Sequence, residues 1–243
     1  MDNFPVITDH ILIFLYGVII PFFSGVKGRE NFDNIIFTEN LRRRFYLANS
    51  VFLGLAASVI LVTWWLYHRP FEALGFRLPV TGSKFTWGVL LGFVLGIAYV
   101  IDIIYSIKQA KNDPEAAAAA DAGTPFLPHH KRELPAYILL CICAGVFEEI
   151  MYRGYMVTYF LPKYNFSNGL PILAAVAPAF LFSLAHYYQG WHAMIKIFLL
   201  SLLLGIIFIL TESLIIVMII HFLIDLTGGF VAMRFLRKME TEG

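Results

Sequence analysis

The sequence predicts an all-α protein, a polytopic transmembrane bundle of about seven spanning helices. Of its 243 residues, 59% are hydrophobic and only 14% are charged, whereas soluble domains carry about 45–50% apolar and roughly 25% charged residues. The mean hydropathy is +0.72, and a soluble core of this size could not bury such an excess. A spanning helix needs about 20 mostly apolar residues. Seven such runs occur, at Thr8–Gly25, Phe45–Tyr67, Phe85–Ile107, Pro135–Phe160, Leu170–His186, Ala193–Leu210 and Ser213–Phe235.

The first three runs differ in their charges. The first follows Asp2 and contains Asp9, with no Lys or Arg in front of it. A cleaved signal peptide begins with basic residues and ends in a small-residue cleavage site, so we expect this helix to be retained. The second run carries no charge and follows the three arginines Arg42–Arg44, and the third has Asp102 near its end.

A polar linker, Lys108–Leu134, separates the first three runs from the last four. It contains three prolines and five alanines at Ala116–Ala120. Such a composition is typical of a mobile connection, although the alanine tract could form a short helix. Two residues separate the last two runs, which predicts a tight antiparallel pair. No internal repeat is visible. We therefore expect one integral membrane domain, residues 1–243, with its motif-bearing core at about residues 135–235.

Lys and Arg in the loops predict the orientation of the bundle, because they are enriched on the cytoplasmic side. With seven spans, the loops of one side carry twelve of these residues and the loops of the other carry four. The N-terminus is then expected outside and the C-terminus in the cytoplasm, in the plasma or inner membrane if the protein is bacterial. The richer side has Lys27, Arg29, Arg42, Arg43, Arg44, Lys108, Lys111, Lys131, Arg132, Arg234, Arg237 and Lys238, and the other has Arg69, Arg77, Lys84 and Lys163.

Charge and cysteine content exclude other classes of protein. The formal net charge is +1, and no broad basic face is evident, which argues against a nucleic-acid partner. The apolar excess excludes a disordered chain and a disulfide-rich secreted domain. Cys141 and Cys143 lie inside an apolar run, so we expect small buried side chains rather than disulfide partners or metal ligands.

Ionisable side chains inside spanning helices are costly and usually functional. The fourth run contains three of them, Glu148, Glu149 and Arg153. Glu149 and Arg153 are four residues apart, so they lie on one helix face and can pair. Glu148 is rotated from Glu149 by about 100° on a helix of 3.6 residues per turn. One carboxylate can therefore be neutralised by the arginine while its neighbour points elsewhere.

Three further ionisable groups lie in two later runs. His186 ends the fifth run, and His221 and Asp225 are four residues apart in the seventh. Each has a structural alternative: the glutamate–arginine pair could only stabilise the fold, a helix-end histidine could bond to backbone, and a His–Asp pair could join two helices. Five unrelated devices on three helices are the less economical interpretation. We expect the two glutamates, the two histidines and the aspartate to meet in one polar cavity, with Glu148 within about 10 Å of at least one histidine, as base catalysis requires.

The order of these residues resembles the pattern of a known family. The chain contains Glu148-Glu149-x-x-x-Arg153, Phe182-x-x-x-His186 and His221-x-x-x-Asp225. These motifs look like the three signature motifs of the CPBP family, which contains the type II CAAX prenyl endopeptidases, the bacterial Abi-type proteins and sorting-signal proteases of the myxosortase kind. The resemblance spans about Tyr137–Gly229 and keeps the order of the motifs.

The resemblance implies a glutamate-type intramembrane endopeptidase, acting on a protein or peptide substrate with a membrane-associated tail. It implies that Glu148 is the general base that activates a water, helped by His186. Glu149 would orient the site and pair with Arg153, and the third motif would bind the oxyanion. The division is chemically sound, because amide hydrolysis needs a nucleophilic water, a base and donors aimed at the developing oxyanion.

Asp225 stands where asparagine is a common alternative in such proteins, and an ionised aspartate cannot donate to an oxyanion. Either Asp225 is protonated, or it orients His221 so that the imidazole donates; we favour the second. Two histidines and several carboxylates could also bind zinc. No HExxH spacing is present, and chemistry with water alone suffices, so we expect no cofactor and no catalytic metal.

Helix geometry leaves two questions open. At 1.5 Å per residue, Glu148 lies roughly 20 Å from the start of its helix and His221 roughly 12 Å into the seventh, at similar depth. His186 does not reach that depth if its helix spans fully from Leu170; the helix must tilt, start deeper or break at Pro178. The positive charges also place Glu148 nearer the outer leaflet, whereas a CAAX-type protease should open towards the cytosol.

Two other functions are compatible with the sequence. The protein could be a non-catalytic membrane protein of the same fold that confers immunity or regulates a partner. It could also be a proton-coupled transporter, because intramembrane carboxylates and histidines form proton relays. A transporter should show repeated halves or paired broken helices, and neither is found, so this function ranks last.

Overall fold

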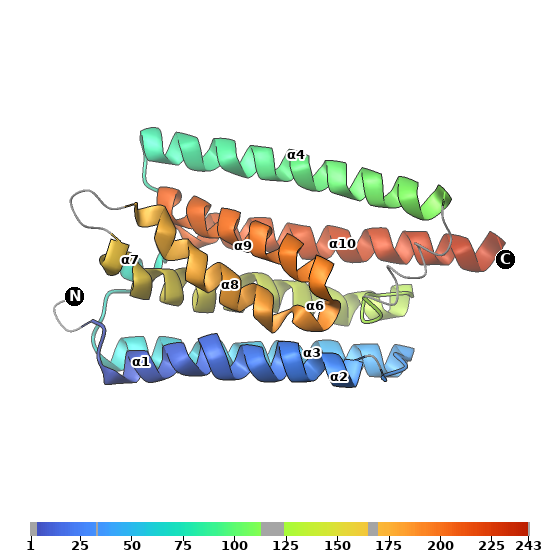
Figure 1. Cartoon of the computed structure of the whole chain (residues 1–243), viewed down its shortest axis with the longest axis horizontal. Helices are drawn as coiled ribbons and strands as arrows, with labels where there is room; N and C mark the ends of the chain where they lie inside the picture. Colours follow the sequence, from blue (N-terminus) through green and yellow to red (C-terminus); the bar gives the residue numbers. More distant parts are fainter. Residues whose placement is uncertain (1–3, 33, 113–123, 165–169, 243) are drawn as a thin grey trace.

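A computed structural model describes residues 4–32, 34–112, 124–164 and 170–242. Every regular element within these residues is a helix, which confirms the all-α fold. Six helices of this described part are long and apolar enough to cross a membrane, and one further apolar helix is shorter. The protein is therefore an integral, multi-pass membrane protein. Its helices lie side by side along one long axis (Figure 1).

The first half of the bundle contains three long helices. The first combines α1 (Ile7–Phe14), the π-helical segments η1 (Leu15–Ile19) and η2 (Phe22–Lys27), and α2 (Gly28–Phe32). It is followed by α3 (Glu39–Leu66), a connector with the 3-10 turn η3 (Phe71–Leu74), and α4 (Ser83–Asn112). The alanine tract of the predicted linker lies outside the described residues.

The second half contains the remaining elements. One long helix combines α6 (Leu134–Cys143), the π-helical segments η5 (Ala144–Glu148) and η6 (Ile150–Val157), and α7 (Thr158–Tyr164), after the 3-10 turn η4 (Lys131–Glu133). The 3-10 segment η7 (Pro171–Ala175) leads into α8 (Val176–Ala185), and η8 (Tyr187–Gln189) leads into α9 (Trp191–Thr211) and then α10 (Leu214–Glu242).

The fifth apolar run differs most from its predicted form. Its α-helix, α8, has 10 residues, about 15 Å, which is too short to cross a bilayer core of about 30 Å. It ends at Ala185, and Gly190 turns the chain with φ 98°, a conformation that glycine adopts without strain. The turn into α9 stops short of the right-hand ends of α4 and α10 (Figure 1). The end of α8 therefore lies inside the bundle, which answers the question of the depth of His186.

The connections gather at the two ends of the bundle. The α2–α3 connection, the segment before α6 and the C-terminus lie at the right-hand end of Figure 1, and the N-terminus, the α3–α4 connector and the α9–α10 turn lie at the left-hand end. This alternation agrees with seven antiparallel segments. The right-hand end carries the loops rich in Lys and Arg, whereas its assignment to the cytoplasm stays a prediction.

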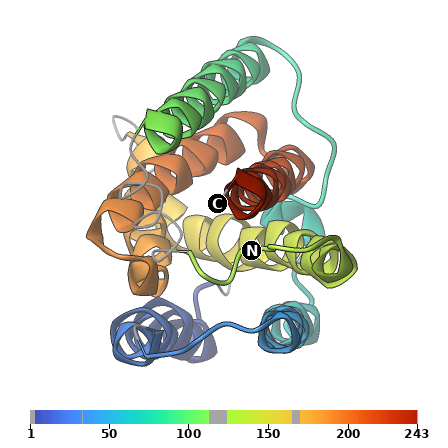
Figure 2. The ribbon, with the colours of Figure 1, turned by 90° about the vertical axis from the view of Figure 1, so that its right-hand side faces the viewer.

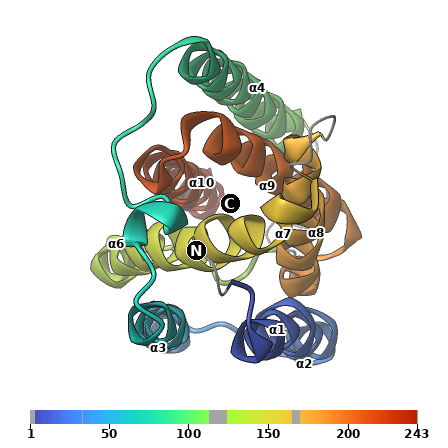
Figure 3. The same ribbon diagram turned by 90° about the vertical axis from the view of Figure 1, so that its left-hand side faces the viewer.

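Viewed along its long axis, the molecule is layered (Figures 2 and 3). The first helix and α3 form one side, α6 and α8 lie in the middle, and α9 and α10 follow, with α4 outermost. Gly88 of α4 allows a close approach to α9, because a Cβ there would lie 2.7 Å from Thr211 Cγ2. The long helix from α6 to α7 is thus enclosed on both sides.

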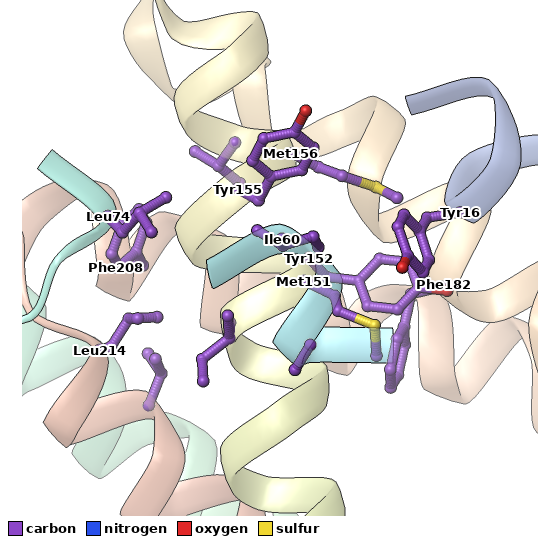
Figure 4. Packing of buried hydrophobic residues seen from close by; sticks show 14 of the residues in the cluster. Tyr16, Ile60, Leu74, Met151, Tyr152, Tyr155, Met156, Phe182, Phe208 and Leu214 are labelled. Atoms are coloured by element: carbon purple, nitrogen blue, oxygen red, sulfur yellow. The ribbon is translucent and has the colours of Figure 1, made fainter. Parts of the chain in front are cut away.

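The glutamate-bearing helix forms the centre of the core. Every residue of η6, Ile150–Val157, is buried. Figure 4 shows its side chains Met151, Tyr152, Tyr155 and Met156 between residues of the surrounding helices. Polar groups on this helix are consequently held deep inside the protein. The surrounding residues labelled there are Tyr16, Ile60, Leu74, Phe182, Phe208 and Leu214.

Two buried ion pairs fix the ends of the bundle. Arg69, in the α3–α4 connector, donates to both carboxylate oxygens of Asp9 on α1 at 2.8 and 2.7 Å, and Tyr155 donates to the same carboxylate at 2.9 Å. At the other end, Arg42 of α3 donates to Glu133 at 2.7 Å. The first helix is therefore bound through Asp9 to the helix that carries the glutamates.

Candidate active site

The backbone around the two glutamates is π-helical, a wider form of helix that occurs frequently at functional sites. Glu148 ends η5, and η6 begins after Glu149. Gly145, one turn earlier, faces α10, where a Cβ would lie 3.0 Å from the backbone nitrogen of Phe222. The absence of a side chain at Gly145 lets α10 approach closely, and this brings His221 to the glutamates.

Glu149 and Arg153 form the ion pair that their spacing predicts. Arg153 Nη1 donates to Glu149 Oε1 at 2.6 Å, and both side chains are fully buried. Arg153 Nη2 donates to the hydroxyl and the carbonyl of Ser201 on α9, at 2.9 and 3.2 Å. The guanidinium also lies 5.0 Å from the ring centre of Phe182 on α8. One arginine thus joins its own helix to two neighbours.

His221 lies between three carboxylates. Its Nδ1 is 2.7 Å from Glu149 Oε1, and because a carboxylate oxygen accepts, Nδ1 carries the hydrogen. Its Nε2 faces Glu148 Oε2 at 3.7 Å and Asp225 Oδ2 at 3.5 Å, which is longer than a hydrogen bond. The carboxylate bonded to the imidazole is therefore that of Glu149, whereas the sequence interpretation had favoured Asp225 as the orienting group.

His186 is held by its own helix. Its Nδ1 lies 2.8 Å from the carbonyl oxygen of Phe182, so Nδ1 donates and Nε2 of the neutral ring is an acceptor. The Phe182 ring lies 4.5 Å from the His186 ring and 6.0 Å from the His221 ring, centre to centre. Phe182 therefore lies in contact with both histidines.

These groups line one cavity of about 390 Å³, within the range of small-molecule and substrate sites. Four of the five predicted residues are on its wall: Glu148, His186, His221 and Asp225. Glu149 is the exception, because it lies behind the wall and reaches the cavity through His221. With Glu148 3.7 Å from His221, the expected convergence is present in the structure.

The cavity extends towards the end of the bundle that is rich in Lys and Arg. Its wall there includes Phe126 and Leu127, which precede α6, and Tyr188 in the α8–α9 turn. Side-chain exposure is 34% for Asp225 and 14% for Glu148. The cavity therefore connects Glu148 to the basic end, which is the end of the bundle rich in Lys and Arg. The depth of Glu148 does not conflict with a site that opens at this end.

Two residues near the site were missed in the sequence. Ser201 holds Arg153, and it is a rare polar residue within its apolar run. Tyr137 donates to the backbone carbonyl of Asp225 at 2.7 Å. Gly229 makes room for it, since a Cβ there would lie 2.2 Å from the Tyr137 ring. In the sequence, the isolated Ser201 and Gly229 were the features that could have indicated these two contacts.

Within the described ranges, no three His, Cys, Asp or Glu side chains are arranged as ligands for a metal ion. Of the carboxylates around His221, that of Glu149 already accepts through Oε1 from both Arg153 and the imidazole. The expectation of chemistry without a catalytic metal stays a prediction.

Comparison with known proteins gives a family match over residues 130–227, to the model described as type II CAAX prenyl endopeptidase Rce1-like. The matched segment contains all three motifs and therefore every predicted site residue. No match was found among curated proteins or among solved structures.

Proposed function

Because residues 130–227 match the family model described as type II CAAX prenyl endopeptidase Rce1-like, we propose that the protein is an intramembrane endopeptidase that hydrolyses its substrate with a glutamate-activated water. The cleaved bond lies near the C-terminus or membrane anchor of a protein substrate. One observation carries the proposal: an imidazole on the cavity wall has one carboxylate bonded to its inner nitrogen and two others, Glu148 and Asp225, facing its outer nitrogen.

Glu148 is the general base. It lies on the cavity wall, whereas the arginine of the same helix is bonded to Glu149. Its carboxylate accepts a proton from a water as the water oxygen bonds to the substrate carbonyl carbon. The same proton then goes to the leaving amine as the carbon–nitrogen bond breaks, so that water and peptide give a carboxylic acid and an amine.

His186 assists Glu148 at the water. Because its Nδ1–H is bonded to the Phe182 carbonyl, Nε2 carries a lone pair that can accept a hydrogen bond from a water in the cavity. A water held by two acceptors, the Glu148 carboxylate and this nitrogen, has both hydrogens engaged and directs a lone pair at the carbonyl carbon. This arrangement fixes the direction of attack.

His221 stabilises the oxyanion. His221 acts here as the protonated imidazole, with a hydrogen on each nitrogen. The Nδ1–H bond to Glu149 fixes the plane of the ring, and Nε2–H donates to the oxygen that becomes negative in the tetrahedral intermediate. In the resting enzyme the facing carboxylates of Glu148 and Asp225, at 3.7 and 3.5 Å from Nε2, balance the charge of this ring. Asp225 thereby stabilises the charged ring of His221 and does not itself donate to the oxyanion.

The substrate is a protein or peptide whose tail lies in the bilayer. Most of the cavity wall is apolar, and the first helix and α3 contribute Ile20, Phe52 and Leu53 to it. Such a wall suits a chain segment that carries apolar side chains or a lipid group. A prenylated C-terminus and an unmodified apolar anchor both meet this description, and the experiment below separates them.

The test is Glu148→Gln, which keeps the size of the side chain and removes the base. Membrane and secreted proteomes of cells with this variant should accumulate uncleaved substrates, and the chemistry of their tails identifies the class. The purified Glu148→Gln protein should cleave its substrate at least ~10²-fold more slowly than the parent protein. Its level in the membrane should be unchanged. Glu148→Asp should retain a small part of the activity. The exposed Glu72 gives a control, Glu72→Gln, and unchanged processing by Glu148→Gln would disprove the mechanism.

A further inference from the structure

Behind the cavity wall, four residues from three helices form a continuous buried chain of hydrogen bonds. Ser201 on α9 accepts from Arg153, Arg153 donates to Glu149, and Glu149 accepts from His221 on α10. Ser201 is 2% exposed and Glu149 is fully buried. Of these four residues, His221 alone is among the described residues that line the cavity, so the other three can act on a substrate only through it.

The geometry at Glu149 makes the position of His221 depend on Arg153. Both Arg153 Nη1 and His221 Nδ1 donate to the same oxygen, Oε1, at 2.6 and 2.7 Å. Oε2 of Glu149 is buried and has no hydrogen-bond partner among the described residues. A carboxylate and a guanidinium frequently form a two-bond fork, with each nitrogen on its own oxygen.

Ser201 prevents this fork. It engages Nη2 of Arg153 with its hydroxyl at 2.9 Å, and its carbonyl adds a weaker contact at 3.2 Å. With Nη2 bound to α9, the arginine approaches Glu149 through Nη1 alone. The carboxylate is then free to keep Oε1 on the line between the arginine and the imidazole.

We propose that Ser201 is a positioning residue, which holds Arg153 in its one-armed contact with Glu149 and thereby keeps His221 directed into the cavity. The proposal rests on the proposed function for its catalytic consequence, but the geometry it describes can be measured without a substrate. Without the Ser201 hydroxyl, Arg153 closes the fork on Glu149, Oε1 rotates, and the imidazole loses its fixed orientation.

The first test is kinetic, with three substitutions of the same residue. The probe is an internally quenched peptide in detergent micelles, with a farnesylated cysteine three residues before its C-terminus. Ser201→Ala and Ser201→Cys should lower kcat by roughly 3- to 10-fold, the effect of one ordinary hydrogen bond, because the lost bond acts on the reaction only through Arg153, Glu149 and His221. KM should stay unchanged because Ser201 is not among the cavity-lining residues. Ser201→Thr, which keeps the hydroxyl, should restore most of kcat.

The matched control is Ser50→Ala. Ser50 is also a buried serine in a spanning helix, but its hydroxyl donates only to the Tyr46 carbonyl of its own turn, at 2.9 Å. This variant should behave as the parent protein in every assay. Equal losses in Ser50→Ala and Ser201→Ala would mean that any buried serine matters, and would overturn the positioning role.

The second test uses no substrate. In protein labelled with 15N-histidine, the Nδ1 resonance of His221, assigned with His221→Gln, reports its bond to Glu149. Ser201→Ala should shift this resonance, and Ser201→Thr and Ser50→Ala should not. An unshifted resonance, or a wild-type kcat in Ser201→Ala, overturns the proposal. Cleavage that survives Glu148→Gln would instead disprove the proposed function and leave the resonance test valid.

Discussion

Arg153 is the residue whose loss we expect to damage folding most directly. Arg153→Ala leaves the buried Glu149 carboxylate without its cation, a change that costs about 3–5 kcal/mol. Arg77→Ala is the control, because its partner Glu212 and Arg77 itself are partly exposed and such pairs contribute about 0–1 kcal/mol. Yield and thermal unfolding in detergent measure both. A folded but inactive Arg153→Ala protein would show that the arginine serves the site through Glu149 and His221 rather than the stability of the fold.

Activity should not depend on a metal ion. In the mechanism proposed above, the water is activated by Glu148 and the oxyanion is bound by His221. Purified enzyme is therefore expected to keep its rate after prolonged treatment with EDTA or phenanthroline, measured against an untreated sample. If chelation silences the enzyme and zinc restores it, the histidines are metal ligands and the glutamate–water mechanism is wrong.

Residue spacing predicted the pairing of Glu149 with Arg153, because both lie on one helix and the helix repeat fixes their relation. It could not predict which nitrogen of His221 meets which carboxylate, nor the contact of Arg153 with Ser201. Those contacts join different helices. Their geometry depends on how α9 and α10 pack against the π-helical segments, which no spacing along the chain encodes.

At the scale of the element, the apolar runs located the long helices, whereas the fifth run, predicted to span the membrane, forms a helix that is too short to do so. Apolar residues continue from Leu170 to Ala185. The helix in this segment begins with a 3-10 turn, Pro171–Ala175, and its α-helical part ends at Ala185, just before His186. Hydropathy measures the environment of a segment and not its backbone. The short α8 matters for function, since its end delivers His186 to the cavity.

Two glycines in spanning helices should respond oppositely to substitution. At Gly25 a Cβ would lie 1.8 Å from the Leu184 carbonyl oxygen, so Gly25→Ala must push the first helix away from α8. At Gly96 nothing lies within 4 Å, and Gly96→Ala should be neutral or stabilising by up to about 1 kcal/mol, the helix propensity difference. Unfolding midpoints in detergent compare the two. Equal midpoints would show that the first helix does not depend on this contact.

At the scale of the whole molecule, composition alone was sufficient for the fold class, because 59% hydrophobic residues leave no alternative to the bilayer. The order of the layers was not predictable. Helices of similar hydropathy can exchange places without changing their exposure to lipid. The central position of the glutamate-bearing helix follows from its π-helical, fully buried segment, which binds neighbours on all sides.

The orientation of the bundle is the last prediction, and it decides which compartment the cavity meets. The positive-inside rule assigns the basic end to the cytoplasm, and the cavity extends towards that end. A cysteine at Arg132, exposed at the basic end, should resist a membrane-impermeant thiol reagent in intact cells and react in inside-out vesicles. A cysteine at Leu78, 80% exposed in the opposite connector, should do the reverse.

Both single cysteines require a background without Cys141 and Cys143, and retained cleavage by that background shows that the fold is intact. If the Arg132→Cys protein is labelled from outside, the bundle is inverted. The cavity would then receive exported substrates rather than cytosolic tails, while the chemistry at Glu148 would be unchanged. The labelling pattern therefore selects the substrate pool in which the uncleaved proteins of the Glu148→Gln cells should be sought.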